Sequence, residues 1–132
     1  MIFIDSNVPM YLVGGPHPHK SEAQILLERA AAAGERLVTD VEVLQEILRR
    51  YTAIARKDAI DAAIAVTLRV VDEVYPIERA DVLRAKEIVQ SSTFSARDAV
   101  HIAIMERYGL RSILSFDSDF DHWPQFQRVH RI

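Results

Sequence analysis

Short apolar runs alternate with longer segments of helical periodicity along the 132 residues of this chain. Strands that alternate with helices favour an α/β fold, with a central, mostly parallel sheet covered by helices on both faces. We expect strands at residues 2–4, 37–38, 71–77, 112–116 and 127–132. We expect helices at 21–33, 39–56, 57–72, 78–90 and 95–109, with turns or loops at 5–9, 14–19 and 117–121.

The length predicts a single domain over residues 1–132. The chain has no cysteine, which excludes a disulfide scaffold, a thiolate metal site and a cysteine nucleophile. Its first apolar run ends at Asp5, too early for a secretory signal, and no apolar stretch approaches the roughly 18 residues that span a bilayer. We therefore expect a soluble, cytoplasmic protein that is not in a membrane.

The net charge of −3 argues against a protein that coats nucleic acid by bulk electrostatics. The negative net charge is a weaker argument against nucleic-acid binding if several acids are gathered around one cation. Four acids neutralised by a divalent metal would leave the rest of the surface slightly positive. A polyanionic substrate therefore stays open.

Acidic residues follow two of the expected strands and open two of the expected helices. In a parallel sheet these positions all lie at the carboxyl edge, where ligands bind. The acids are Asp5, Glu42 or Glu46, Asp98 and Asp117. Clustered carboxylates repel one another unless a cation compensates their charge. Oxygen ligands without Cys or His favour Mg²⁺ or Mn²⁺ over zinc, so the pattern predicts a hard-metal site.

Each of these acids also has an ordinary structural role when it is taken alone. Asp5 could cap a turn, and Asp98 fits the third position of a capping box opened by Ser95. Asp117 lies in an expected turn, where aspartate is common. Only their predicted location at one edge of the sheet indicates that these acids form a functional site.

Glu42 and Glu46 are separated by helical geometry. Glu42 lies towards solvent and is explained by a capping box that Thr39 would open. Glu46 lies at the margin of the apolar face, and its ordinary role would be an ion pair with Arg50 one turn later. We therefore prefer Glu46 as the ligand.

Four stretches of the chain, in this order, resemble the PIN-domain ribonucleases, and within them the VapC toxins of bacterial and archaeal toxin–antitoxin pairs. The stretches are IFIDSN at 2–7, VLQEIL at 43–48, RDAVHIA at 97–103 and LSFDSDFD at 114–121. The resemblance covers essentially the whole chain. It implies a PIN-like three-layer α/β/α sandwich.

The resemblance also implies which acids act. The three core acids of the family match Asp5, Glu46 and Asp98, and a fourth matches Asp117, with Asp119 as a possible substitute. In the family these residues catalyse the reaction and hold the metal. The implied activity is endoribonuclease cleavage that depends on Mg²⁺, for which Mn²⁺ can substitute. The reaction implied by the resemblance is hydrolysis of RNA phosphodiester bonds.

Further residues and partners follow from the same comparison. Ser6 and Ser115 match small polar residues that accompany the metals as accessory groups. Arg49 and Arg50 belong to the densest basic patch, and Arg50 shares the margin of Glu46, so phosphate contact competes there with an ordinary solvated helix face. The resemblance implies homodimerisation and inhibition by a cognate VapB-type antitoxin.

Two other functions fit the same residues. One is a PIN-type nuclease that processes RNA without a toxin role, and the other is a non-catalytic regulatory module whose acids bind a metal or a partner. His101, one turn after Asp98, is expected to pack or to support the ligands without binding the metal itself. The loop at 14–20, with two prolines and two histidines, departs from the family and bears on substrate choice or on nothing.

Overall fold

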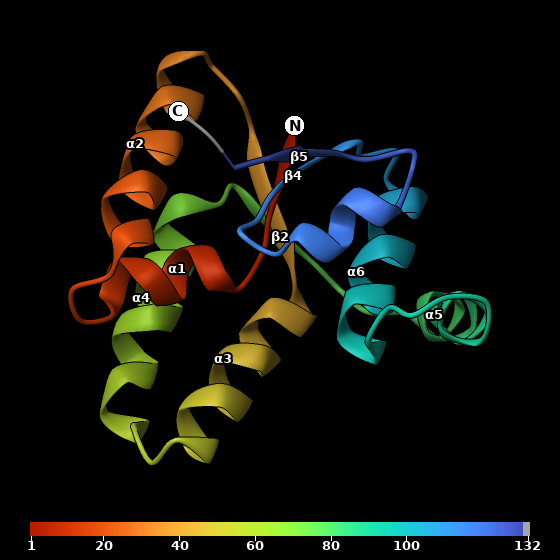
Figure 1. Cartoon of the computed structure of the whole chain (residues 1–132), viewed down its shortest axis with the longest axis horizontal. Coiled ribbons are helices and arrows are strands. Elements are labelled where there is room, and N and C mark those ends of the chain that lie inside the picture. Colours follow the sequence, from red (N-terminus) through yellow and green to blue (C-terminus); the bar gives the residue numbers. More distant parts are fainter. Residues whose placement is uncertain (131–132) are drawn as a thin grey trace.

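The structure is a computed structural model, and it describes residues 1–130. Its centre is a five-stranded sheet in the order β3-β2-β1-β4-β5, and every neighbouring pair of strands is parallel (Figure 1). The strands are β1 (Ile2–Ile4), β2 (Leu37–Asp40), β3 (Glu73–Tyr75), β4 (Ser112–Leu114) and β5 (Gln127–Val129). The predicted α/β class with a central parallel sheet is confirmed.

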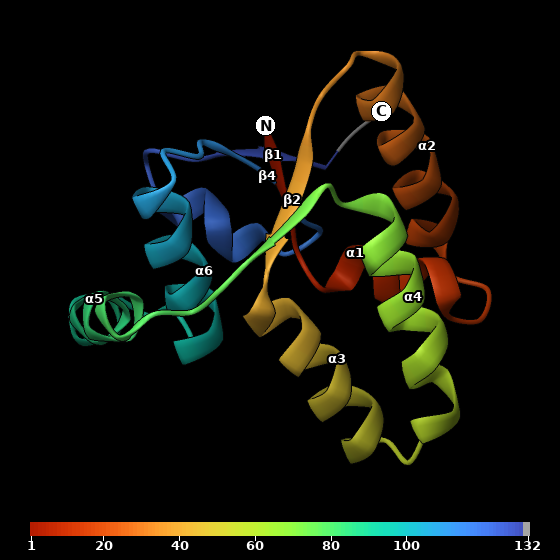
Figure 2. The same ribbon diagram turned by 180° about the vertical axis from the view of Figure 1, so that it is seen from behind.

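Helices cover both faces of this sheet. They are α1 (Asn7–Val13), α2 (Pro18–Ala32), α3 (Val41–Ala53), α4 (Ile60–Val70), α5 (Arg79–Gln90) and α6 (Ala96–Arg107), with short 3₁₀ helices η1 (Lys57–Ala59) and η2 (Ser118–His122). In Figures 1 and 2, α1, α2 and α4 lie on one side of the sheet and α5 and α6 on the other. Among residues 1–130, no helix has the length and apolar character needed to cross a membrane.

The two faces of the sheet are built from alternating residues of the same strands. In β1, Ile2 and Ile4 pack with the cluster under α1 and α2, while Phe3 packs with the cluster formed by α3, α5 and α6. All three side chains are buried. Alternation is what a strand imposes, because successive side chains point to opposite faces. The apolar run IFI therefore fills two cores and places the next residue, Asp5, at the edge of the sheet.

The order of the strands positions the site. The chain leaves β1 towards β2 on one side and later returns to β4 on the other, where Ile4 pairs with Leu114. This reversal is a topological switch point, and open parallel sheets bind ligands in the crevice beside it. The residues just after β1 and β4 therefore lie side by side.

Two predictions near the N-terminus were wrong. Residues 5–9 are not only a turn, because helix α1 begins at Asn7 and accommodates Pro9 in its first turn, where backbone N–H groups have no helical partner. Helix α2 begins at Pro18 and not at Ser21. Proline suits the first helical position, and the preceding His17 caps the helix by accepting a hydrogen bond from the His19 N–H at 3.1 Å.

The capping box predicted at Thr39 is also wrong, by one residue. Thr39 is buried within β2, and its hydroxyl donates to the carbonyl of Ile4 at 2.7 Å. The N-cap of α3 is Asp40, whose carboxylate accepts from the Val43 N–H at 2.9 Å. Asp40 is therefore a strand-end acid that also begins a helix.

The other elements lie where predicted, most with shorter bounds, whereas β2 extends beyond the predicted 37–38 to Asp40. Helix α3 ends at Ala53, and the segment predicted as one helix at 57–72 is η1 followed by α4. Strands β3 and β4 have three residues each, and the predicted turn at 117–121 contains η2. The final strand ends at Val129, and the last two residues of the strand predicted at 127–132 lie outside the described residues.

Ala55, just beyond α3, adopts a left-handed conformation with φ of 57°. This backbone region ends many helices, and it costs an L-residue energy that glycine does not incur. We expect Ala55→Gly to stabilise the protein by about 0.5–1 kcal/mol, measured by urea unfolding. As a control, Ala65→Gly in the exposed middle of α4 should destabilise it by about 1 kcal/mol. Equal losses in both variants would contradict the prediction.

Candidate active site

The four acids predicted for the site line one cleft of about 620 Å³. Asp5 follows β1, Glu46 lies in the second turn of α3, Asp98 in the first turn of α6, and Asp117 just before η2. Asp5 and Glu46 are buried, at 4% and 7% exposure, whereas Asp98 and Asp117 are half-buried. Residues 112 positions apart in the sequence therefore meet in one place.

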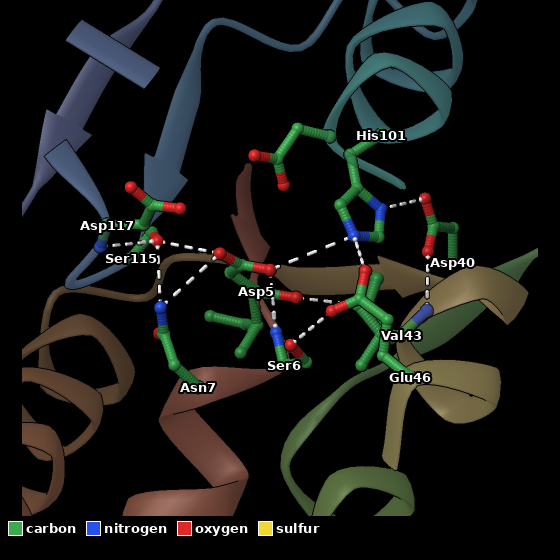
Figure 3. A network of polar contacts seen from close by, with 12 residues as sticks. Asp5, Ser6, Asn7, Asp40, Val43, Glu46, His101, Ser115 and Asp117 are labelled. Carbon is green, nitrogen blue, oxygen red and sulfur yellow. Dashed lines mark hydrogen bonds and ion pairs between the residues drawn. The ribbon is translucent and has the colours of Figure 1, made fainter. Parts of the chain in front are cut away.

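Asp5 is held by donors from both neighbouring strand ends. Its Oδ2 accepts from the Ser115 hydroxyl at 2.7 Å and from the Asn7 amide at 3.5 Å, and its Oδ1 accepts from the Ser6 N–H at 2.8 Å. Figure 3 shows this group of contacts at the carboxyl ends of β1 and β4. Burial raises the pKa of Asp5, and the charge of Glu46 adds to this, although nearby His101 and the donors act in the other direction.

Glu46 is fixed by two partners. Its Oε2 accepts from the Ser6 hydroxyl at 2.5 Å, and its Oε1 lies 2.7 Å from His101 Nε2. Burial favours the neutral acid, but the hydrogen bonds and charge of His101 outweigh burial, so the pKa of Glu46 is lowered. The structure thus gives the two candidate accessory serines a definite placement, because Ser6 holds Glu46 and Ser115 holds Asp5.

His101 lies fully buried between the acids. Its Nδ1 is 2.6 Å from Asp40 Oδ2, and its Nε2 is 2.7 Å from Glu46 and 3.7 Å from Asp5 (Figure 3). Burial alone would lower the pKa of the ring. The charge and hydrogen bond of Asp40, with the hydrogen bond of Glu46, outweigh burial and raise the pKa of His101 well above its ordinary value. The ring is therefore an imidazolium that donates to both carboxylates.

Asp98 forms the other half of the acidic cluster. Ligand atoms of Asp98, Asp117 and Asp119 lie within 4.8 Å of one another, as do those of Asp5, Glu46 and His101. Burial, and then the charge of Asp5, raise the pKa of Asp98 to about 7, with smaller contributions from Asp117 and Glu46. The charges of both halves of the cluster therefore act on Asp98, and negative charge is concentrated at this edge of the sheet.

The donor set fits a hard divalent cation. It offers carboxylate oxygens from at least four residues, and their mutual repulsion is the condition that a bound cation would relieve. His101 has both ring nitrogens occupied by Asp40 and Glu46, so it holds these carboxylates in place and is poorly placed to bind a metal itself. This supporting role is what we expected of His101.

Comparisons with known proteins agree with this geometry. A protein-family model for the PIN domain matches residues 2–124 of the chain. The chain is also 55% identical over 130 residues to "VapC ribonuclease Mb1869c" of Mycobacterium bovis, covering 98% of this chain and 99% of that protein. This chain belongs to the PIN-domain family, among the VapC ribonucleases.

Solved structures of other PIN proteins share this fold. The crystal structure of VapC20 of Mycobacterium tuberculosis, described as a "Sarcin-Ricin loop cleaving toxin", has a TM-score of 0.81 at 24% identity, and the match covers 100% of both chains. VapBC2 of Rickettsia felis, solved bound to a DNA fragment from its promoter, has a TM-score of 0.75 at 12% identity, again over 100% of both chains. The predicted PIN-like α/β/α architecture is confirmed.

The basic residues predicted to contact RNA separate in the structure of this PIN domain. Arg50 lines the cleft one helical turn after Glu46, whereas Arg49 is exposed and is not among the described residues of the lining. Arg97, next to Asp98, is exposed and also lines the cleft. Its positive charge lowers the pKa of Glu46, which shows that it lies near the acids. Sequence analysis did not single out Arg97 as a candidate RNA contact.

Asp40 and Asn7 are the other residues of the PIN site that sequence analysis missed. Asp40 directly ends β2, so the strand-end rule that found Asp5 and Asp117 also points to it, but the supposed cap at Thr39 obscured this signal. Asn7 links the ends of β1 and β4 by donating to Ser115 Oγ at 3.2 Å and accepting from the Phe116 N–H at 3.3 Å. No local pattern marks this link, because Ser115 and Phe116 lie more than 100 residues from Asn7 in the sequence.

The raised pKa of Asp98 predicts a pH-dependent effect on the metal-free PIN domain. A carboxyl whose pKa is 3.8 when unfolded and about 7 when folded favours the unfolded state increasingly as the pH rises between these values. We expect Asp98→Asn to raise the stability at pH 8, in EDTA, by on the order of 2 kcal/mol, and to change it little at pH 4. Thermal melts at both pH values measure this, and a variant destabilised equally at both would contradict it.

Proposed function

We propose that this chain is an endoribonuclease that depends on Mg²⁺, or on Mn²⁺ in its place, and acts as the toxin of a VapBC-type toxin–antitoxin pair. One observation carries the proposal. Asp5, Glu46, Asp98 and Asp117 come from four separate segments and line the same cleft at the switch point of the sheet. A chain that only packed its core would have no reason to gather four carboxylates there, with one histidine paired to them and two of them buried.

Asp5, Glu46 and Asp98 would hold one metal ion, and Asp117 would complete a second or water-mediated site, with Asp119 as its substitute. When bound, the metal would act as a Lewis acid on the phosphodiester and would lower the pKa of a water molecule, so that the water is nucleophilic near neutral pH. The protein residues supply position. Ser115 and Ser6 hold the carboxylates of Asp5 and Glu46 through hydrogen bonds of 2.7 and 2.5 Å.

The imidazolium of His101 orients the Glu46 carboxylate on the buried side of the site. It donates to Glu46 Oε1 and leaves Oε2 with the Ser6 hydroxyl, so the position of this carboxylate is fixed at both oxygens. Asp40 in turn fixes the ring by accepting from Nδ1. Arg50 and Arg97, on the lining of the cleft, are suited to bind RNA phosphates beside the acids.

The experiment is cleavage of a labelled transfer, ribosomal and messenger RNA panel by the purified chain, with Mg²⁺, with Mn²⁺ and with EDTA. We expect metal-dependent endonucleolytic cleavage of at least one RNA that is abolished in Asp98→Asn, which is purified identically to detect contaminating nuclease. An intact panel, together with calorimetry that detects no divalent binding, would overturn the nuclease and favour a regulatory binding module.

A second experiment distinguishes a toxin from a housekeeping RNA-processing nuclease. Relatives of similar fold were solved as antitoxin complexes, such as VapBC2 of Rickettsia felis, which supports a VapB-type partner for this chain. Induced expression should arrest growth, Asp98→Asn should not, and co-expression of a small antitoxin from the neighbouring gene should restore growth. Normal growth on expression of an active nuclease would favour the processing role.

A further inference from the structure

Four aromatic rings form a continuous group next to the acidic cluster. We call them the aromatic wall, and they are Tyr11, His17, His19 and Phe116. Tyr11 stacks on His17 with 4.5 Å between centroids, and His19 stacks on Phe116 at 4.4 Å. The Tyr11 ring meets Phe116 edge-on at 5.4 Å, which joins the two stacks.

The wall is joined directly to the site. Phe116 lies between Ser115 and Asp117 in the sequence, and its N–H donates to Asn7 Oδ1 at 3.3 Å. Tyr11 is four residues after Asn7 in α1, so both side chains lie on one face of that helix. Tyr11 and His17 line the same cleft as the acids. The wall therefore begins one turn of α1 after Asn7, on the lining of the cleft that the acids also line.

Ordinary core packing does not account for Tyr11. Within residues 1–130 it belongs to neither of the two hydrophobic clusters nor to the partly buried residues packed against them. It is half-buried, and its partner His17 is exposed. Tyr11 therefore presents at the cleft an aromatic ring that fills no core, and such a ring is suited to a planar ligand.

The loop that carries His17 is held in place without a ligand. His17 Nδ1 accepts from the His19 N–H at 3.1 Å, and the Lys20 ammonium donates to the Gly14 carbonyl at 3.0 Å, which ties the end of α1 to the start of α2. A ring held in this way loses little freedom on binding. This segment belongs to the stretch at 14–20 for which sequence analysis left open a role in substrate choice.

We propose that the aromatic wall stacks an unpaired nucleobase of single-stranded RNA, in the nucleotide next to the phosphate held at the acidic cluster. This inference rests on the proposed function, because it places RNA in the cleft. The cleft combines what single-strand binding needs, with arginines Arg50 and Arg97 for the backbone and aromatic faces for the bases. Stacking tolerates any base, so the wall selects unpaired over paired nucleotides and leaves base identity to other contacts.

The test compares two RNA-like chains of equal charge. The probes are a 12-nucleotide oligouridylate and a 12-unit ribose-phosphate chain without bases, both competing with a labelled oligouridylate in Ca²⁺, so that binding is read without relying on cleavage. We expect wild type to prefer the chain with bases roughly tenfold, and Tyr11→Ala to bind both equally. Tyr11→Phe keeps the ring and should keep the preference.

Two further variants guard against misfolding and loss of charge. His17→Asn removes an exposed ring and keeps an acceptor that can cap α2, and it should lose part of the preference. Arg97→Ala should weaken both probes by the same factor. The proposal is overturned if the wild type shows no preference for the chain with bases, or if Tyr11→Ala keeps that preference. A wild type that shows the preference but cleaves no RNA in Mg²⁺ or Mn²⁺ supports the wall, while the proposed nuclease fails.

Discussion

His101→Leu should lower the free energy of unfolding by about 3–5 kcal/mol, which corresponds to a fall in Tm of at least about 10 °C. The imidazolium is fully buried and donates to Asp40 and Glu46 at 2.6 and 2.7 Å. Leucine fills a similar volume but leaves both carboxylates buried without their cation. Breaking a buried pair on one side is far more costly than losing a surface ion pair.

The pH dependence gives a second signature of the same pair. Because its partners raise the pKa of His101 in the fold, its contribution to stability is complete below the unfolded value of 6.5. That contribution is lost as the pH rises from there through the folded pKa. We expect the His101→Leu variant to lack this decline.

Chemical denaturation between pH 6 and pH 9 measures both effects. His122→Leu, at an exposed position of η2, is the matched control and should stay within about 0.5 kcal/mol of wild type. Adding Asp40→Asn to His101→Leu removes one orphaned charge and keeps a good helix cap, so the double variant should regain part of the loss. A His101→Leu protein as stable as wild type would refute the charged triad of Asp40, His101 and Glu46.

Asp5→Asn should weaken Mn²⁺ binding and RNA cleavage by at least about 100-fold each while leaving the fold intact. Asp5 is 4% exposed, groups with Glu46 and His101, and its charge also raises the pKa of Asp98 in the other half of the acidic cluster. Asparagine keeps the acceptor for the Ser6 N–H, but it offers no negative charge and its NH₂ cannot accept from Ser115 or Asn7 as Oδ2 does. Burial already disfavours the charged form of Asp5, so the neutral amide should not lower the melting temperature of the metal-free protein.

Calorimetric titration with Mn²⁺, single-turnover cleavage and a thermal melt, each on the same preparation, decide this prediction. Asp61→Asn removes an equal charge from the exposed face of α4 and should behave as wild type in all three assays. Unchanged Mn²⁺ affinity in Asp5→Asn would mean that the metal is not held at the end of β1. A variant that fails to fold would show that Asp5 is required for structure in its charged form.

Much of the fold could be predicted because its determinants are local. The run IFI, the helix opened by Ser95 and the strand from Ser112 depend on periodicity and capping within a few residues, and they lie where predicted. The parallel sheet followed from the alternation of these elements. Two strand ends then placed Asp5 and Asp117 at one edge of the sheet, and the start of a predicted helix placed Asp98 there.

The errors occurred where two local signals competed. At Thr39 and Asp40, both residues are good caps, and only the hydrogen bond from Thr39 to Ile4 in the neighbouring strand decides that the helix begins one residue later. At Pro9 the sequence pattern indicated a break, whereas the first turn of α1 accommodates proline.

By itself, then, the sequence determined the α/β class and the edge of the sheet that carries the acids, since both follow from strand and helix periods. Only the tertiary structure decided that His101 lies between Asp40 and Glu46, that Arg97 and not Arg49 lines the cleft, and that Tyr11 meets Phe116 beside the site. These contacts join residues 55 to 105 positions apart, or depend on which side of a helix faces the cleft. Burial and pKa shifts arise from such contacts, so they could not be predicted from local patterns.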